Sequence, residues 1–397
     1  MARKRKFITW LSVLCMVFPR IFVAYAFYGL PSILAVKFTY KQSGYLFLAF
    51  LALTTSWIIS SQVANISITS YILSFLLQLP FIMFLLQFDI KDNLNCLRIL
   101  RIINITVCIF SFINMVQYGF PFLLPYINYV PDVFSAFYFF GGAKIVTIIG
   151  FFALAAEIFL VKPKKHLFWL FIALINFIVP NYLIGILMGL GALSFVAIRK
   201  KPALIPLLLI LVLIILPYAI DRSQNLNQGF ATNVGMNPKV FAYYSIFQLY
   251  GQFPTTVIFG TGLGAFSSTP ALWSSTYISA LSTNNIPKLP AFFMSQYHAS
   301  ILGPTLSMLS SDKFSLESSA SKPYTSVSSI FTEYGLFFGF FIMILAYRVF
   351  EKMGWKKKYT ITIACFAVFI FTTDQWHDSL FFGYMLLLSR NISTYST

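Results

Sequence analysis

The sequence predicts an all-α, polytopic helical membrane protein of about 12 transmembrane helices with one large extracytoplasmic loop. Three observations support this fold class. The chain is 58% hydrophobic and 19% aromatic but only 10% charged, which is far from the composition of a soluble domain. Apolar runs long enough to cross a bilayer follow one another along most of its 397 residues. One long polar interval, Pro217–Ser329, interrupts these runs, and no bilayer can absorb it.

The charge pattern also indicates a membrane protein. A formal net charge of +17 arises from 28 lysines and arginines against 11 acidic residues. These basic residues gather at the ends of the apolar runs, which is typical of the cytoplasmic face. They do not alternate with aromatic residues on a polar domain, so nucleic acid is not expected as a partner. The four cysteines lie in or beside apolar segments, and no disulfide framework is implied.

Ten apolar segments predict membrane helices by their length, with the shorter ones tolerated inside a bundle. Pro180 cannot continue a regular helix, so the two segments beside it are predicted to form a tight helical hairpin. The predicted helices are 43–60, 66–88, 102–118, 144–161, 167–179, 181–198, 203–220, 335–350, 359–373 and 376–389.

Orientation follows from the positive-inside rule. The rule places Lys356–Lys358 in the cytoplasm, and it places Arg3–Lys6 there as well. The chain before residue 37 must then cross the membrane an even number of times. We therefore expect an uncleaved N-terminal hairpin of two helices, 7–18 and 21–36, which turns on the outer side at Arg20.

These helices divide the chain into three parts. Residues 1–220 form the N-terminal transmembrane helices, 221–334 form the large periplasmic loop, and 335–397 form the C-terminal transmembrane helices. Within the loop, Ser307–Ser329 is rich in serine, a composition that orders poorly by itself and predicts a mobile flap.

One helix is predicted inside the loop. Asn237 and Pro238 are a helix-start signal, and Gly251 is a stop signal. The helix either lies on the outer membrane surface or packs within the loop. Its apolar face consists of Phe241, Tyr244 and Phe247.

Glycines at alternate positions follow this helix, at Gly260, Gly262 and Gly264. A dinucleotide site needs G-x-G-x-x-G between a strand and a helix, and neither the spacing nor the surroundings fit. Glycines in this pattern instead allow a sharp turn and a close approach to another element or to a ligand.

The order of these elements resembles the O-antigen polymerase and O-antigen ligase superfamily. A basic residue outside a helix, Arg222, precedes Lys239 at the head of the loop helix. The G-x-G-x-F turn Gly262–Phe266 follows, and Glu333–Gly339 then enters the next helix with the pattern E-x-G-x-x-x-G. The helix number and the position of the loop also match, so the resemblance covers most of the chain.

This resemblance implies metal-independent, inverting-type transfer of a glycan from an undecaprenyl diphosphate carrier to an acceptor hydroxyl, on the outer face of the bacterial inner membrane. No cofactor is implied. The implied partners are the undecaprenyl-diphosphate-linked oligosaccharide, membrane lipid and a chain-length regulator. Ligase-like members carry an arginine where this chain has Lys239, a basic residue where it has Pro180-Asn181, and a histidine near the position of Tyr324. These departures leave the general base open.

A lipid diphosphate leaving group needs fixed cations at the membrane surface. Arg222 is the best-placed candidate, because its planar guanidinium can hold two phosphate oxygens at once. Lys239 and, in the hairpin topology, Arg20 are the other candidates for diphosphate binding. Headgroup anchoring or a solvated helix surface is the alternative explanation of these cations.

The acceptor hydroxyl needs a catalytic proton acceptor, for which His298 and Glu333 are the candidates. His298 has the most suitable unperturbed pKa, and Glu333 stands at the motif position. A structural imidazole and a packing or capping carboxylate are the alternatives. His377, between Asp374 and Asp378, lies at another outer turn and could face the same cavity.

The sequence therefore predicts a membrane glycosyltransferase that polymerises lipid-linked repeats into a surface polysaccharide, such as O-antigen or capsule. An O-antigen ligase that transfers the glycan to a lipid or protein acceptor is one alternative. A lipid-linked glycan flippase is another, although such transporters are expected to show internal repeats and buried ionisable residues at the midplane.

Overall fold

The structure is a computed structural model that describes residues 10, 34–90, 96–117, 134, 142–161, 167–180, 182–200, 238–268, 271, 294–303 and 324–395. Side chains at 197–200, 238–242, 302 and 394–395 are outside this description. The regular elements in the described ranges are helices, apart from one isolated bridge between Val36 and Ile90. The all-helical fold class is thus confirmed for this part of the chain.

Five of the described helices, α3, α4, α5, α7 and α17, are long and apolar enough to cross a membrane, which suggests a membrane protein. Shorter apolar helices are α8, the Leu183–Val196 part of α9, and α18. The elements are α3 Tyr40–Ser61, α4 Ile68–Leu85, α5 Cys96–Gln117, α7 Gly142–Leu160, α8 Leu167–Ile178, α9 Leu183–Lys200, α11 Pro238–Gln252, α12 Thr255–Phe259, the π-helix η5 His298–Leu302, α17 Ser326–Met353, α18 Lys358–Thr373 and α19 Leu380–Tyr395.

Most predicted helices inside the described ranges are present, with ends that shift by a few residues. The two helices predicted on either side of Pro180 are present as α8 and α9. The helix at Pro238 is confirmed too, but it continues past Gly251 to Gln252. Segment 203–220, segment 7–18 apart from residue 10, and segment 21–36 apart from residues 34–36 lie outside the described residues, so the total of twelve helices stays a prediction.

The predicted start of a helix at residue 335 coincides with a kink at Gly335, but a helical segment that was not predicted precedes the kink. Thr325 caps the helix: its side chain accepts the Ser328 N–H, and the Ser328 side chain accepts the Thr325 N–H. Therefore α17 begins at Ser326, and Gly335 is a kink inside it, with φ 71°. The last residues of the serine-rich segment, Ser326–Ser329, form the buried first turn of α17 and are not part of a flap.

Two further boundaries differ from the prediction. Residues 376–379 are a turn and not the start of a helix, because Asp374 ends α18 in an extended conformation and α19 begins at Leu380. The second boundary is the start of α5, which begins at Cys96 instead of residue 102. This earlier start places Arg98 and Arg101 on the helix, not in the preceding connection.

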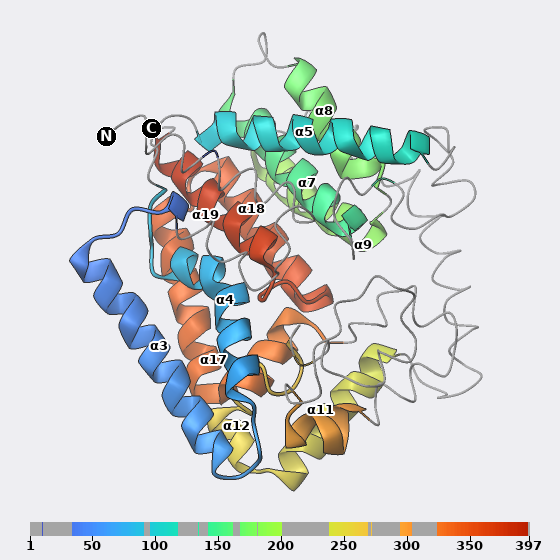
Figure 1. Ribbon diagram of the computed structural model, residues 1–397. Coiled ribbons are helices and arrows are strands. Elements are labelled where there is room, and N and C mark those ends of the chain that lie inside the picture. The colour runs from blue at the N-terminus through green and yellow to red at the C-terminus, as the bar shows by residue number, and fades with distance from the viewer. Residues whose placement is uncertain are drawn as a thin grey trace.

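The helices form two groups joined by α18 and α19 (Figure 1). One group contains α5, α7, α8 and α9, and the other contains α3, α4, α11, α12 and α17. Phe151 of α7 stacks on Phe366 of α18 with 3.9 Å between the ring centroids. On the other side, Gly383 lets α19 approach α4 closely, because an added Cβ would lie 2.7 Å from the Phe81 nitrogen.

The two ends of the helix bundle carry different side chains. At one end, Lys352 donates to the Gln87 side chain at 3.0 Å, and Arg390 pairs with Asp89 at 3.1 Å. We call this the basic end. It is formed by the starts of α3, α5 and α18 and by the ends of α4, α17 and α19. Its described basic residues are Lys37, Lys41, Arg98, Arg101, Arg348, Lys352, Lys356, Lys357, Lys358 and Arg390.

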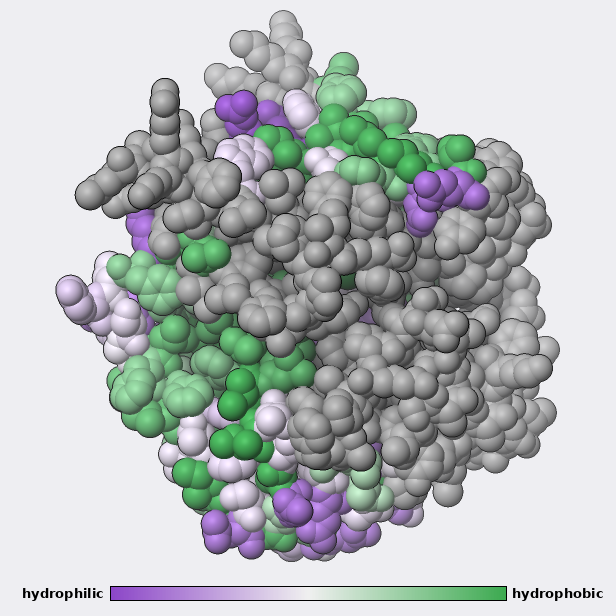
Figure 2. Space-filling model, in the orientation of Figure 1, coloured by the Kyte–Doolittle hydropathy of each residue, from purple (hydrophilic) through white to green (hydrophobic). Residues whose placement is uncertain are grey.

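The flank between the ends is apolar. Hydrophobic side chains cover the described surface along α3, at the left of Figure 2, and hydrophilic ones gather at the bottom of that view. Phe47 and Leu48 of α3 are 59% and 60% exposed, and Phe337 of α17 is 67% exposed. Such exposed apolar faces suit helices that contact lipid.

Candidate functional site

At the end opposite the basic end, a turn at Gly260–Ser268 packs against the kinked helix α17; we call it the glycine turn. The kink at Gly335 releases two helix carbonyls from their usual bonds. The Thr261 N–H donates to the Thr332 carbonyl at 2.9 Å, and the Gly262 N–H donates to the Glu333 carbonyl at 3.1 Å. The kink therefore creates the docking edge for the turn.

The side chain of Glu333 completes this contact. Its Oε1 accepts the N–H groups of Phe266, Ser267 and Ser268 at 3.3, 2.9 and 2.7 Å. Its Oε2 accepts the Gly264 N–H at 3.1 Å. Backbone N–H groups that converge in this way form a concave anion site, here filled by a carboxylate that is 1% exposed. Because both oxygens are engaged, the geometry favours a positioning role for Glu333 over that of proton acceptor.

The glycines of the turn are needed for its shape. Gly260, Gly262 and Gly264 have φ values of 77°, 84° and 82°, a region that favours glycine. Two backbone carbonyls of the turn accept hydrogen bonds from serine hydroxyls. Ser60 of α3 donates to the Gly260 oxygen at 2.7 Å, and Ser70 of α4 donates to the Gly264 oxygen at 2.6 Å. The sequence-based prediction of a sharp turn with a close approach to another element is confirmed.

Tyr324 connects the glycine turn to α11. Its ring packs against Phe266 with 5.5 Å between the centroids, and its hydroxyl shares a 2.7 Å hydrogen bond with Ser245 of α11. Burial raises the pKa of the Tyr324 phenol above its ordinary value, so the group stays protonated. The residue near the expected histidine position of the superfamily thus lies at the turn but is not a base at neutral pH.

His298 lies in η5 beside the same turn. The backbone N–H of His298 donates to the Ser295 hydroxyl at 3.1 Å, and that hydroxyl donates to the Ala265 carbonyl of the turn. The imidazole is fully buried, and its two ring nitrogens have no hydrogen-bond partner among the described residues. Burial lowers the pKa of His298 to about 4, so the ring is neutral at physiological pH. A neutral imidazole can accept a proton.

A buried ion pair lies where α7, α9 and α18 meet. Lys144 in the first turn of α7 donates to Asp374 Oδ2 at 2.9 Å, and the Tyr182 hydroxyl donates to the same oxygen at 2.8 Å. Asp374 is 1% exposed, and about a quarter of the Lys144 side chain reaches solvent. The lysine balances the charge of this buried carboxylate.

The turn after Asp374 is bound to the glycine turn and to the start of α17. The Gln375 side chain donates to the Ser267 carbonyl at 2.9 Å and to Asp378 Oδ2 at 3.1 Å. The Ser326 N–H donates to the Asp374 carbonyl at 3.0 Å, and its hydroxyl accepts the His377 N–H at 3.1 Å. His377 thus belongs to the same buried polar cluster.

Glu333 and His298 both lie at the glycine turn: Glu333 accepts its N–H groups, and His298 is linked to it through Ser295. Helix α11, which begins with Pro238 and Lys239, packs against η5 and α12. The Lys239 side chain and the residues Arg20 and Arg222 lie outside the description. Sequence reasoning missed the link between Gln375 and the glycine turn, although the polar run at 372–379 between two apolar segments was a signal.

No family model, curated protein or solved structure matches the chain. The resemblance to the O-antigen polymerase and ligase superfamily stays a prediction that rests on its motifs.

Proposed function

We propose that the protein is a membrane glycan polymerase that joins oligosaccharide repeats carried on undecaprenyl diphosphate. The observation that carries the proposal is the bonding of Glu333 to Gly264–Ser268. The two motifs of the resemblance are 65 to 69 residues apart in the chain, yet these hydrogen bonds join them in one buried unit. A shared site is the simplest reason for two distant motifs to meet.

The charge distribution supports an outer location for this unit. Among the side chains that the structure describes, the basic residues gather at the basic end, and Lys144 is the cation at the glycine-turn end. The positive-inside rule then favours a cytoplasmic basic end and a periplasmic glycine turn. A carrier whose glycan has already crossed the bacterial inner membrane would meet the turn there.

In the proposed reaction, the acceptor hydroxyl attacks the anomeric carbon of the donor sugar. The bond from that carbon to the diphosphate oxygen breaks, and its electron pair leaves with the diphosphate. Arg222 and Lys239, with Arg20 as a third cation, are the proposed ligands of this growing negative charge. His298 is the proposed acceptor of the hydroxyl proton, because its two ring nitrogens have no hydrogen-bond partner among the described residues.

Gene deletion followed by gel analysis of the surface polysaccharide tests the proposal. Loss of a polymerase leaves a single repeat on the final acceptor, which is the expected result. Long chains that remain on the carrier indicate a ligase instead, and cytoplasmic accumulation of carrier-linked repeats indicates a flippase; either outcome contradicts the proposal.

Complementation with Arg222→Ala extends the test to the site. The variant should reach the membrane at normal levels and restore no chain extension. Arg348→Ala is the matched control, because Arg348 is an exposed arginine at the basic end, far from the glycine turn. Normal chain length with Arg222→Ala would remove this residue from the site.

A further inference from the structure

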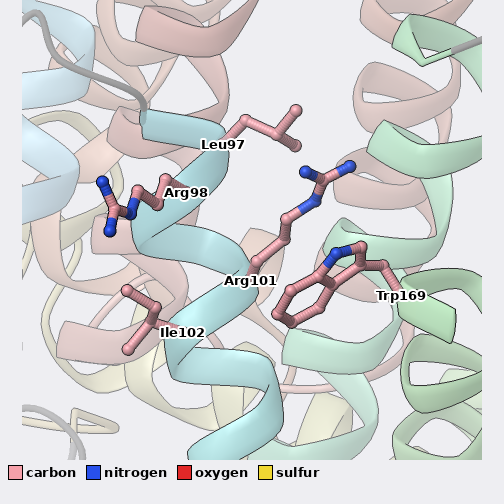
Figure 3. A pocket seen from close by; sticks show the side chains of 5 residues that line it. All are labelled: Leu97, Arg98, Arg101, Ile102 and Trp169. Atoms are coloured by element: carbon pink, nitrogen blue, oxygen red, sulfur yellow. The ribbon is translucent and has the colours of Figure 1, made fainter. Parts of the chain in front are cut away.

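The first turns of α5 and α8 enclose a pocket of about 420 Å³ at the basic end (Figure 3). It lies far from the glycine turn, so the proposed transferase chemistry does not explain it. The pocket is lined by Leu97, Arg98, Arg101, Ile102 and Trp169.

Arg101 is fixed inside this pocket. Its Nε and Nη2 donate to the two Glu157 carboxylate oxygens at 2.6 and 2.9 Å. The guanidinium also lies over the Trp169 ring, 5.3 Å from its centroid. Glu157 therefore balances the charge of Arg101, which lines one side of the pocket.

Arg98 is different. It is exposed, and no hydrogen bond or ion pair joins it to another described residue. In Figure 3 its guanidinium lies on the side of α5 away from Trp169, above Ile102. None of the five described residues that line the pocket is acidic, and no described side chain pairs with Arg98.

An apolar stripe continues from Arg98 along the same face of α5. Ile102 lies one turn further, and Ile109 and Ile113 follow at helical spacing with exposures of 52% and 46%. The rise from Arg98 to Ile109 is about 16 Å at 1.5 Å per residue, close to the depth of one leaflet of a hydrocarbon core of about 30 Å. Phe168 on neighbouring α8 is 56% exposed, so apolar side chains flank the pocket on both helices.

We propose that Arg98 binds the headgroup phosphate of an anionic phospholipid, with an acyl chain along Ile102, Ile109 and Ile113. A cation at the polar end of a lipid-facing stripe matches the order of phosphate and hydrocarbon in a phospholipid. A net negative headgroup is specified because a zwitterionic lipid would bring a second cation next to Arg98, and none of the described lining residues is an acid that could pair with it.

Native mass spectrometry of the purified full chain tests the proposal, after equilibration with micelles that contain equal amounts of phosphatidylglycerol and phosphatidylcholine. The wild type should retain phosphatidylglycerol in preference. Arg98→Gln should lower the affinity for phosphatidylglycerol about fivefold, as expected for loss of one cation near an anionic headgroup. Because Arg98 is exposed, the variant should keep its melting temperature.

Arg348→Gln is the matched control, since it removes an exposed arginine of the same end that does not line the pocket. Its lipid retention should equal that of the wild type. An equal loss of phosphatidylglycerol affinity in both variants would indicate a general charge effect. Unchanged affinity in Arg98→Gln would show that Arg98 does not bind the lipid. Either result overturns the proposal. Displacement of the lipid by inorganic phosphate at matched concentration would indicate a simple anion site and overturns it as well.

Discussion

Glu333 occupies a place where a protein could otherwise hold an anionic ligand. Four N–H groups of the glycine turn point at its carboxylate, which lies on a different element of the chain. The bonds stabilise the turn only while this side chain is in place. Its contacts therefore fix the conformation of the glycine turn.

Replacement of this carboxylate should be costly. Glu333→Ala leaves buried N–H groups without an acceptor, and we expect the free energy of unfolding to fall by about 3 kcal/mol. Titration with sodium dodecyl sulfate in mixed micelles measures this change. The control is Glu351→Gln, an exposed acid in the last turn of α17, which should change stability by less than about 0.5 kcal/mol. Similar stabilities for both variants would show that the turn does not depend on Glu333.

His298 should make the stability of the protein depend on pH. The unfolded imidazole titrates at about 6.5, whereas burial lowers the native pKa to about 4. Below pH 6.5 the unfolded chain binds a proton that the native protein rejects, so this contribution is complete above about pH 6.5 and is lost as the pH falls towards 4.

The expected loss from His298 is about 2 kcal/mol by about pH 5. Thermal unfolding of the wild type and of His298→Gln at about pH 7.5 and pH 5 measures it. The variant should lose most of this pH dependence, because glutamine does not titrate. An unchanged slope in the variant would show that His298 is not buried as a neutral ring.

At the scale of elements, α12, the glycine turn and α17 interlock through two glycines. A Cβ added at Gly335 would overlap the Ile258 carbonyl, and one at Gly260 would overlap the Glu333 carbonyl. Both residues also have positive φ values. The kink of α17 and the entry into the turn thus require each other.

Gly260→Ala and Gly335→Ala should each lower the free energy of unfolding by about 3 kcal/mol, through the positive φ and the overlap together. Gly44→Ala is the control, because an added Cβ there has nothing within 4 Å and the residue lies in a helix. The control should be neutral or slightly stabilising. Melting curves in detergent give the comparison, and tolerance of alanine at Gly335 would contradict the interlocked arrangement.

The sequence predicted elements better than their contacts. Apolar length locates α4, α7 and α18 within a few residues, since hydrophobic runs of that length have one stable arrangement in a membrane. The start of α17 was placed too late because the cap at Thr325 lies in a serine-rich stretch that reads as disordered. In a similar way, the polar turn before Leu380 was read as helix because its neighbours are apolar.

Contacts between residues that are far apart in the chain could not be predicted from the sequence. Lys144 and Asp374 are 230 positions apart, and nothing local in either segment indicates the other. The motif at Glu333 could be recognised, but its function as the acceptor of four N–H groups depends on a kink that only the fold reveals. The positions of Arg20 and Arg222 remain sequence-based predictions.

For the whole molecule, the proposed function depends on which side of the membrane each end of the bundle faces. The basic end and the glycine-turn end lie at opposite ends of α3, α4 and α17. The proposed polymerase would meet its lipid-linked glycan outside the cytoplasm, so the proposal requires the glycine turn to face the periplasm.

Labelling of single cysteines in intact cells with a membrane-impermeant maleimide tests this claim most directly. Gln252→Cys reports the glycine-turn end and Lys356→Cys the basic end; both positions are exposed, and the background has its four native cysteines replaced by alanine. We expect the cysteine at position 252 to react in intact cells, and the one at position 356 to react only after the membrane is opened. Labelling of position 356 but not of position 252 in intact cells would contradict this expectation.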